Sequence, residues 1–255
     1  LDFNKPSIII ANHSSFLDIL LILMLNPKVI MVVKDWVYNS PIFGLLIRYS
    51  GYIFVNKGAE QNLTEAKQLV KNGYSIVIFP EGSRSTDGNL TRFHKGAFYL
   101  AQALEIDITP ILIHGASTIL PKNDFLLSKG KISLKVLPRI KHEDLSFGKT
   151  YRERSKSISK VFKAEFYELK NSKENAIYFS NLIFQNYIFK GPLLEWYFKI
   201  KWKFEAKNFD FYNSIIGNKK DILDVGAGYG YFTYFLHFKN IKRDIIALDY
   251  DADKI

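Results

Sequence analysis

A histidine and an aspartate with four residues between them are the first side chains whose types and spacing could do chemistry. His13 follows the apolar run 8–11, and Asp18 comes five positions later. A histidine with a carboxylate partner is a minimal general base, because the carboxylate fixes the ring tautomer and stabilises the imidazolium that forms. Ser15 and Asp18 also have the spacing of a helix-capping pair. The pair alone leaves the catalytic and the structural interpretation open.

A turn with acidic, glycine and basic residues follows a second apolar run. Residues 75–79 predict a buried strand, and Glu81, Gly82 and Arg84 follow it, with Lys95 further on. Turns at the carboxyl ends of strands are where α/β sheets bind ligands. Arg84 and Lys95 could hold a phosphate group, the first as a bidentate fork and the second as a point charge. Glu81 could pair with one of them or accept hydrogen bonds from hydroxyls; an ordinary Glu81–Arg84 ion pair is the alternative.

Strand and helix patterns alternate around these two groups of residues. We expect helices over 59–72, 96–104 and 151–170, and strands over 8–10, 29–33, 51–55, 75–79, 110–113 and 131–137. Ser14 or Ser15 is expected to cap a helix that carries Asp18. Strands separated by helices predict an α/β fold with a mostly parallel sheet flanked by helices.

Four blocks of sequence resemble, in order, the motifs of the glycerolphosphate and lysophospholipid acyltransferases. They are the pair His13 and Asp18, residues 51–57, residues 79–85 and residues 108–111. The similarity covers roughly residues 5–140, and it is specific because the four motifs occur together in the family's order. It implies an acyltransferase-type fold. It also implies transfer of an acyl group from acyl-CoA or acyl-acyl carrier protein (acyl-ACP) to a hydroxyl of a lysophospholipid or glycerolphosphate-like lipid.

The same resemblance assigns roles to individual residues. His13 is implied as the general base and Asp18 as its orienting partner. The implied substrate-binding residues are Lys57, Glu81, Gly82, Arg84 and Lys95. Lys57 stands where the family usually has arginine, and lysine keeps the charge but lacks the fork. The acceptor is therefore left open between lysophosphatidic acid and another lipid, such as an aminolipid or an ornithine-type lipid.

A serine hydrolase is the alternative enzyme class for the same region. Ser14 and Ser83 are its possible nucleophiles, but neither stands in the small-x-Ser-x-small turn of that class. We therefore expect direct displacement on the thioester without an acyl-enzyme. His94, His114 and His142 have no carboxylate or cysteine at ligand spacing, so no metal site is expected.

The cysteine content and the charge of the chain limit the kinds of partner that it is expected to bind. The 255-residue chain has no cysteine and a net charge of +10, and residues 141–220 combine 16 basic with nine acidic side chains. The absence of cysteine excludes disulfides and suits a reducing compartment. The basic, aromatic middle suits an anionic membrane surface, although a solvated lysine-rich surface is the alternative. Nucleic acid is not expected as a partner, because the chain lacks an aromatic-basic recognition motif.

The longest uncharged apolar run, residues 19–25, is too short to span a membrane. Residues 36–52 could instead lie in the membrane interface and admit an acyl chain, or form ordinary core. We expect peripheral attachment at the cytoplasmic face of an inner membrane. The chain begins without methionine shortly before its first expected strand, which favours a piece of a longer protein.

A glycine-rich turn near the end of the chain predicts a second site. Strands expected over 222–225 and 245–248 enclose it, and its residues of interest are Asp224, Gly226, Gly228, Gly230 and Asp249. Glycines let backbone approach a nucleotide-like ligand, and an acid after the second strand can hold ribose hydroxyls. The block resembles the opening of class I S-adenosylmethionine-dependent methyltransferases, which implies that cofactor; a dinucleotide-binding domain is the alternative. With one Rossmann-like βαβ unit, we expect no methylation.

Three regions follow from these patterns. We predict a lysophospholipid acyltransferase-like domain over 1–170, a helical aromatic and basic linker over 171–216, and the incomplete methyltransferase domain over 217–255. This order resembles bacterial fusion proteins that also carry a membrane exporter region. A non-catalytic module that binds lipid or membrane within such a fusion is the alternative to the enzyme.

Overall fold

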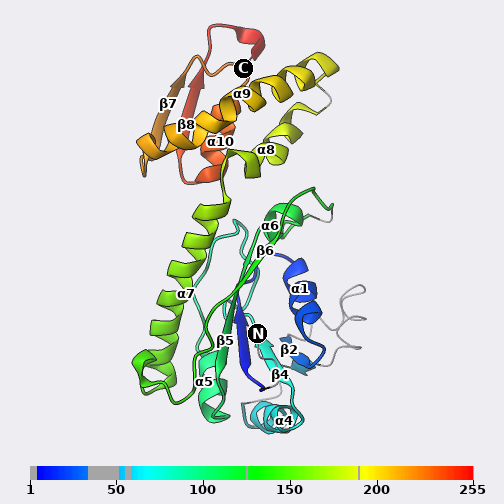
Figure 1. The fold of residues 1–255 in the computed structure, drawn as a ribbon, viewed down its shortest axis with the longest axis vertical. Helices are drawn as coiled ribbons and strands as arrows, with labels where there is room; N and C mark the ends of the chain where they lie inside the picture. Colours follow the sequence, from blue (N-terminus) through cyan, green and yellow to red (C-terminus); the bar gives the residue numbers. More distant parts are fainter. Residues whose placement is uncertain (1–4, 34–51, 55–58, 125, 189, 255) are drawn as a thin grey trace. The chain divides into compact units, whose positions relative to one another are not determined.

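The computed structural model describes residues 5–33, 52–54, 59–124, 126–188 and 190–254 (Figure 1). The chain divides into two compact units, Leu1–Leu169 and Lys170–Ile255. The first unit therefore holds both groups of predicted acyltransferase residues, and the second holds the glycine-rich turn. Residues 171–216, which the sequence predicts as a linker, pack in the second unit.

A six-stranded sheet forms the centre of the first unit. Its strand order is β3-β2-β4-β1-β5-β6, and every neighbouring pair is parallel except β5 with β6. The strands are β1 (Ile8–Ala11), β2 (Val29–Val33), β3 (Tyr52–Phe54), β4 (Ser75–Ile78), β5 (Ile108–His114) and β6 (Ser133–Val136). The sheet confirms the mostly parallel α/β fold that the alternating pattern predicts.

The central strand β1 is buried on both faces, which explains its run of apolar residues. Ile8 and Ile10 pack in one hydrophobic cluster with residues of α4 (Ala59–Lys71), α5 (Gly96–Ala103) and α7 (Tyr151–Lys173). Ile9 and Ala11 pack in another cluster with α1 (Leu17–Leu25) and α6 (Ala116–Ile119). Helices thus cover both faces of the sheet, as Figure 1 shows for α1 and α7. A short 3-10 helix, η2 (Leu145–Phe147), precedes α7.

The register of the central strands brings the predicted site together. Ile10 of β1 lies beside Ile78 of β4, and both strands run in the same direction. Because parallel neighbours end at the same edge of a sheet, the residues after β1 and after β4 begin side by side. His13 and the turn with Glu81 therefore lie at one edge.

The second unit consists of helices and a two-stranded parallel sheet. Its elements are α8 (Ala176–Phe184), η3 (Gln185–Tyr187), α9 (Pro192–Ile216), β7 (Asp221–Val225), α10 (Tyr231–Lys239), β8 (Asp244–Leu248) and η4 (Ala252–Lys254). Strands β7 and β8 pair in parallel and are joined through α10, which makes a βαβ unit. Buried aromatic rings of α8, α9 and α10, including Phe179, Trp202 and Phe235, form the core that holds these helices together.

Candidate active site

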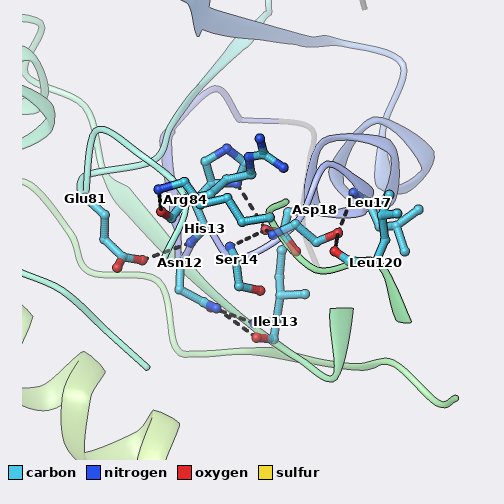
Figure 2. Close-up of polar contacts among 11 residues, drawn as sticks. Asn12, His13, Ser14, Leu17, Asp18, Glu81, Arg84, Ile113 and Leu120 are labelled. Carbon is cyan, nitrogen blue, oxygen red and sulfur yellow. Dashed lines mark hydrogen bonds and ion pairs between the residues drawn. The ribbon is translucent and has the colours of Figure 1, made fainter. Parts of the chain in front are cut away.

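His13 and Asp18 form a direct contact at the carboxyl end of β1 (Figure 2). The distance from His13 Nδ1 to Asp18 Oδ2 is 3.0 Å, and the Asp18 side chain is completely buried while that of His13 is 14% exposed. Since Oδ2 also accepts two backbone N–H groups, we assign the proton of the contact to Nδ1. The Nε2 atom then carries a lone pair, and it has no hydrogen bond to any residue that the structure describes. The pair therefore has the arrangement of a general base and its orienter.

Asp18 also holds the backbone that leads into α1. Its Oδ2 accepts hydrogen bonds from the N–H groups of Ser14 at 2.6 Å and Ser15 at 2.8 Å. The capping and the catalytic interpretations are therefore compatible, because the same Asp18 oxygen binds the backbone N–H groups and contacts the His13 ring. The helix itself begins after Phe16, which provides no side-chain cap. The prediction that Ser14 or Ser15 is the capping residue is thus wrong by position, although the Ser15 hydroxyl accepts the Leu17 N–H at 3.2 Å.

Two neighbours fix the His13 loop from other directions. The Phe79 ring stacks on the His13 ring, with centroids 4.1 Å apart and planes 17° from parallel. The side chain of Asn12, which is 2% exposed, donates to the Ile113 carbonyl and accepts the Ile113 N–H, both at 2.8 Å. This carboxamide continues the pairing of β1 with β5 by one residue. The role of Asn12 was not predictable from the sequence, because an asparagine after a strand is equally typical of an ordinary turn.

Glu81 connects the His13 loop to the segment that follows the turn. Its Oε1 accepts the His13 N–H at 2.9 Å, and its Oε2 accepts the N–H and the hydroxyl of Thr91 at 2.7 and 2.8 Å. Glu81 is only 4% exposed and forms no ion pair with Arg84, so the predicted alternative of a Glu81–Arg84 pair is wrong. These bonds give the buried carboxylate neutral partners. The contact with Thr91, ten residues further along the chain, was not predicted from the sequence either.

Arg84 lies close to the His13–Asp18 pair, and one of its N–H groups has no hydrogen-bond partner among the described residues. Its guanidinium stacks on the Phe16 ring at 3.6 Å, and its Nη1 is buried without a hydrogen-bond partner among the described residues. Burial lowers the pKa of Arg84 from its ordinary value, and the charge of Asp18 opposes this shift. Figure 2 shows Arg84 beside the His13–Asp18 contact. A buried, unpartnered cationic N–H group is satisfied by an anion, so this position suits a phosphate group.

The remaining acyltransferase residues lie in different surroundings. Gly82 adopts a φ of +72°, and a side chain there would meet the His94 ring at 3.1 Å, so glycine fits both the turn and the close approach. Lys95 lines a separate groove with residues of α7. Lys57 lies outside the residues that the structure describes. So does the segment 36–52 except for Tyr52, so its two interpretations, membrane interface and ordinary core, both stay predictions.

The glycine-rich turn of the second unit lies between β7 and α10. Gly226, Gly228 and Gly230 all have positive φ angles, of 78°, 57° and 73°. Asp249, directly after β8, accepts the Asp251 N–H at 2.9 Å and the Gly228 N–H at 2.6 Å, and these two bonds lower its pKa. The Asp224 carboxylate accepts the hydroxyl of Thr233 at 2.5 Å, which ties the strand to α10. The structure therefore places the three predicted glycines in one turn with Asp249 bonded to it, whereas the Asp224 side chain contacts α10.

Neither unit shows a metal site in its described part. Residues 5–33, 52–54, 59–124, 126–188 and 190–254 contain no cluster of three or more side chains able to hold an ion.

Comparison with known proteins agrees with the geometry of the first unit. The family described as Acyltransferase matches residues 2–114. A chloroplastic 1-acyl-sn-glycerol-3-phosphate acyltransferase from Brassica napus is 32% identical over 134 residues, which are 51% of this chain and 39% of that protein. The 1-acyl-sn-glycerol-3-phosphate acyltransferase of Saccharomyces cerevisiae is 31% identical over 150 residues, 56% of this chain and 50% of that protein. The chain spans half or less of the length of these two relatives.

A solved structure extends the similarity to the fold. The crystal structure of the 1-acyl-sn-glycerophosphate acyltransferase PlsC from Thermotoga maritima superimposes with a TM-score of 0.57 at 30% sequence identity. The superposition covers 66% of this chain and 67% of that one.

Proposed function

Because this chain belongs to the acyltransferase family, we propose that it transfers an acyl group from acyl-CoA or acyl-ACP to the free hydroxyl of a lysophospholipid, with lysophosphatidic acid as the first candidate. The observation that carries the proposal is the contact from His13 Nδ1 to buried Asp18 at 3.0 Å, which leaves Nε2 available as a base. The names of the relatives from Brassica napus and Saccharomyces cerevisiae support the same acceptor.

The chemistry needs only one displacement. His13 Nε2 takes the proton of the acceptor hydroxyl while its oxygen attacks the thioester carbonyl. The carbon–sulfur bond then breaks, and the proton on Nε2 passes to the leaving thiolate, so base and acid are the same atom. No described hydroxyl is hydrogen-bonded to Nε2, and Ser14 is buried, which favours this route over the serine-hydrolase alternative.

Arg84 is the residue that supports a phosphate on the acceptor. Its unpartnered Nη1 lies in the same neighbourhood as the catalytic pair, so a phosphate held there would bring the adjoining hydroxyls toward His13. Placing the reacting groups in one geometry supplies a large share of such a rate enhancement. If Lys57 binds the acceptor phosphate more weakly than arginine would, an aminolipid or ornithine-type acceptor is the alternative.

We propose an anionic membrane surface as the place where the acceptor is met, at its cytoplasmic face. Helix α9 exposes a stripe of large apolar side chains along its length: Leu193, Trp196, Phe204, Phe211 and Ile215. Lysines 199, 203 and 207 occur on the same helix. An apolar stripe with neighbouring lysines is typical of helices that lie in the interface of anionic bilayers.

Helices long and apolar enough to cross a bilayer are absent from the part of the chain that the structure describes.

A thiol-release assay with the whole chain tests both proposals. We expect release of CoA from acyl-CoA when lysophosphatidic acid is present in vesicles, and faster release when the vesicles contain anionic lipid. Acyl-ACP replaces acyl-CoA in a parallel arm, and an aminolipid replaces the acceptor in another. Reaction only with the aminolipid would overturn the acceptor assignment. Vesicle binding without any thiol release would favour a non-catalytic membrane module.

For the second unit we propose the adenosine-binding half of an S-adenosylmethionine site. The parallel βαβ unit, the three glycines with positive φ and Asp249 support it. Leu223, Val225 and Ile246 leave one face of the two-stranded sheet exposed, so this unit is not expected to enclose a cofactor or to methylate.

NMR titration can detect the weak binding that such a half site gives. S-adenosylmethionine is expected to shift the amide signals of Gly226, Gly228 and Gly230, and Asp249→Ala should remove the shifts because the ribose loses its partner. Larger shifts with a nicotinamide dinucleotide would favour the dinucleotide-binding alternative. An absence of shifts with both would contradict a nucleotide site.

A further inference from the structure

A basic groove lies in the first unit between the segment 90–95 and helix α7. Its volume is about 510 Å³. Five cations line it, and no acidic side chain does: Arg92, Lys95, Arg152, Lys156 and Lys163. Ser155 and Ser159 add two hydroxyl groups to the α7 wall. A concave site of this size is typical for a small molecule rather than for a flat membrane or protein surface.

None of the five groove cations forms an ion pair with a residue that the structure describes; Arg152 donates a hydrogen bond to the Tyr151 hydroxyl at 3.3 Å. In the same unit Lys135 pairs with Glu165 at 2.7 Å and Arg139 with Asp107 at 2.8 Å, but no described carboxylate lies within ion-pair distance of the five groove cations. Arg152, Lys156 and Lys163 follow each other at helical spacing on one face of α7, where like charges repel. Helix stability therefore does not explain this arrangement, whereas a bound anion does.

The groove is physically connected to the catalytic pair. Thr91, which lines it, donates two hydrogen bonds to Glu81, and the other oxygen of Glu81 accepts the His13 N–H. A second hydrogen bond joins the segment 90–95 to the turn after β4: the His94 N–H donates to the Pro80 carbonyl at 2.7 Å. Phe93 packs edge-on against Phe162 of α7, with ring centroids 5.1 Å apart, and this holds the two walls together.

We propose that this groove binds the phosphate-rich nucleotide end of the acyl donor, the diphosphate and phosphomonoester of coenzyme A. The inference rests on the proposed acyl transfer. The acceptor carries one phosphate group, and Arg84 beside His13 already offers a position for it. Five cations without ion-pair partners instead match the several negative charges of the nucleotide. The Ser155 hydroxyl is a further donor to phosphate oxygens, whereas the Ser159 hydroxyl donates to the Lys156 carbonyl. The thioester, at the other end of the carrier, is then directed toward His13.

Calorimetry with free coenzyme A and with adenosine 3′,5′-bisphosphate tests the groove without catalysis. In Lys156→Glu/Lys163→Glu we expect the Kd for both probes to rise at least about tenfold, because two charge-assisted contacts become repulsive. The matched control is Lys67→Glu/Lys131→Glu. It reverses two exposed lysines of the first unit that do not line the groove, and it should change Kd less than about twofold, since long-range charge effects are screened. Circular dichroism verifies that both variants keep their helix.

The kinetic arm separates the donor from the other possible ligands. The groove variant should raise KM for acyl-CoA and leave KM for the lysolipid unchanged. A rise only in the KM of the lysolipid would assign the groove to the acceptor and overturn the proposal. Equal losses in groove and control variants would overturn it too, and so would weaker binding of acyl carrier protein with unchanged binding of coenzyme A. Because the calorimetry requires no turnover, a failure of the acyltransferase assay alone is distinguishable from a failure of the groove.

Discussion

Replacing His13 with alanine is expected to lower kcat for acyl transfer by about 10²–10⁴-fold, the range that a positioned general base contributes. The Nε2 lone pair disappears, and no described side chain is placed to take the proton of the acceptor hydroxyl in its stead. KM for both substrates should change little, because the ring contacts Asp18 and Phe79 rather than the residues proposed to bind phosphate. The rates come from the thiol-release assay with acyl-CoA and lysophosphatidic acid.

His142→Ala is the matched control for this prediction. His142 is a partly exposed histidine that lies near Asp107, before β5, whereas His13 follows the carboxyl end of β1. The His142→Ala variant should retain the wild-type kcat, which would show that the loss of an imidazole elsewhere does not lower the rate. If His13→Ala turned over like the wild type, the general-base mechanism would be wrong even though the family assignment would stand.

The mostly parallel sheet and the contact between His13 and Asp18 at its edge could be predicted from the sequence. His13 and Asp18 stand out because few residue types can act as a base and its orienter, and because an apolar run places them at a strand end. The parallel sheet follows from consecutive β-branched residues such as those of β1, which pack on both faces. Residue type, spacing and apolar runs are local features of the sequence, so they can be recognised without knowledge of the tertiary contacts.

The contacts that hold the His13 loop in place could not be predicted from the sequence, because they join segments that are far apart in it. Glu81 resembled a member of a local ion pair, yet it bonds to His13, 68 residues earlier, and to Thr91. Asn12 acts on Ile113, 101 residues later. The basic groove requires that residues 90–95 meet α7, about sixty residues further on. Spacing and residue type do not encode such pairings; only the fold brings them together.

Asp18→Asn is expected to reduce both activity and stability, for separable reasons. The Oδ2 atom accepts three N–H groups in a buried position, and its neighbour Oδ1 has no partner among the described residues. An amide either turns its NH₂ toward those donors or buries it unsatisfied where Oδ1 was. Either outcome should lower the free energy of unfolding of the first unit by about 2–4 kcal/mol, measured by urea denaturation. The kcat should fall on the order of a hundredfold, because a neutral amide stabilises the imidazolium less than a carboxylate does.

The double variant His13→Ala/Asp18→Asn decides whether Asp18 acts on the rate through His13. If it does, the second substitution should leave the residual kcat of His13→Ala unchanged, while the loss of stability persists in both backgrounds. A further hundredfold loss of kcat in the absence of the imidazole would instead show that Asp18 has a separate catalytic effect, such as on the nearby Arg84. Unchanged stability in Asp18→Asn would show that the three N–H groups do not depend on the carboxylate. The kcat thus reports the orienting role of Asp18, and the free energy of unfolding reports its structural role. Because Asp18 Oδ2 serves both roles, we expect Asp18→Asn to lower both quantities.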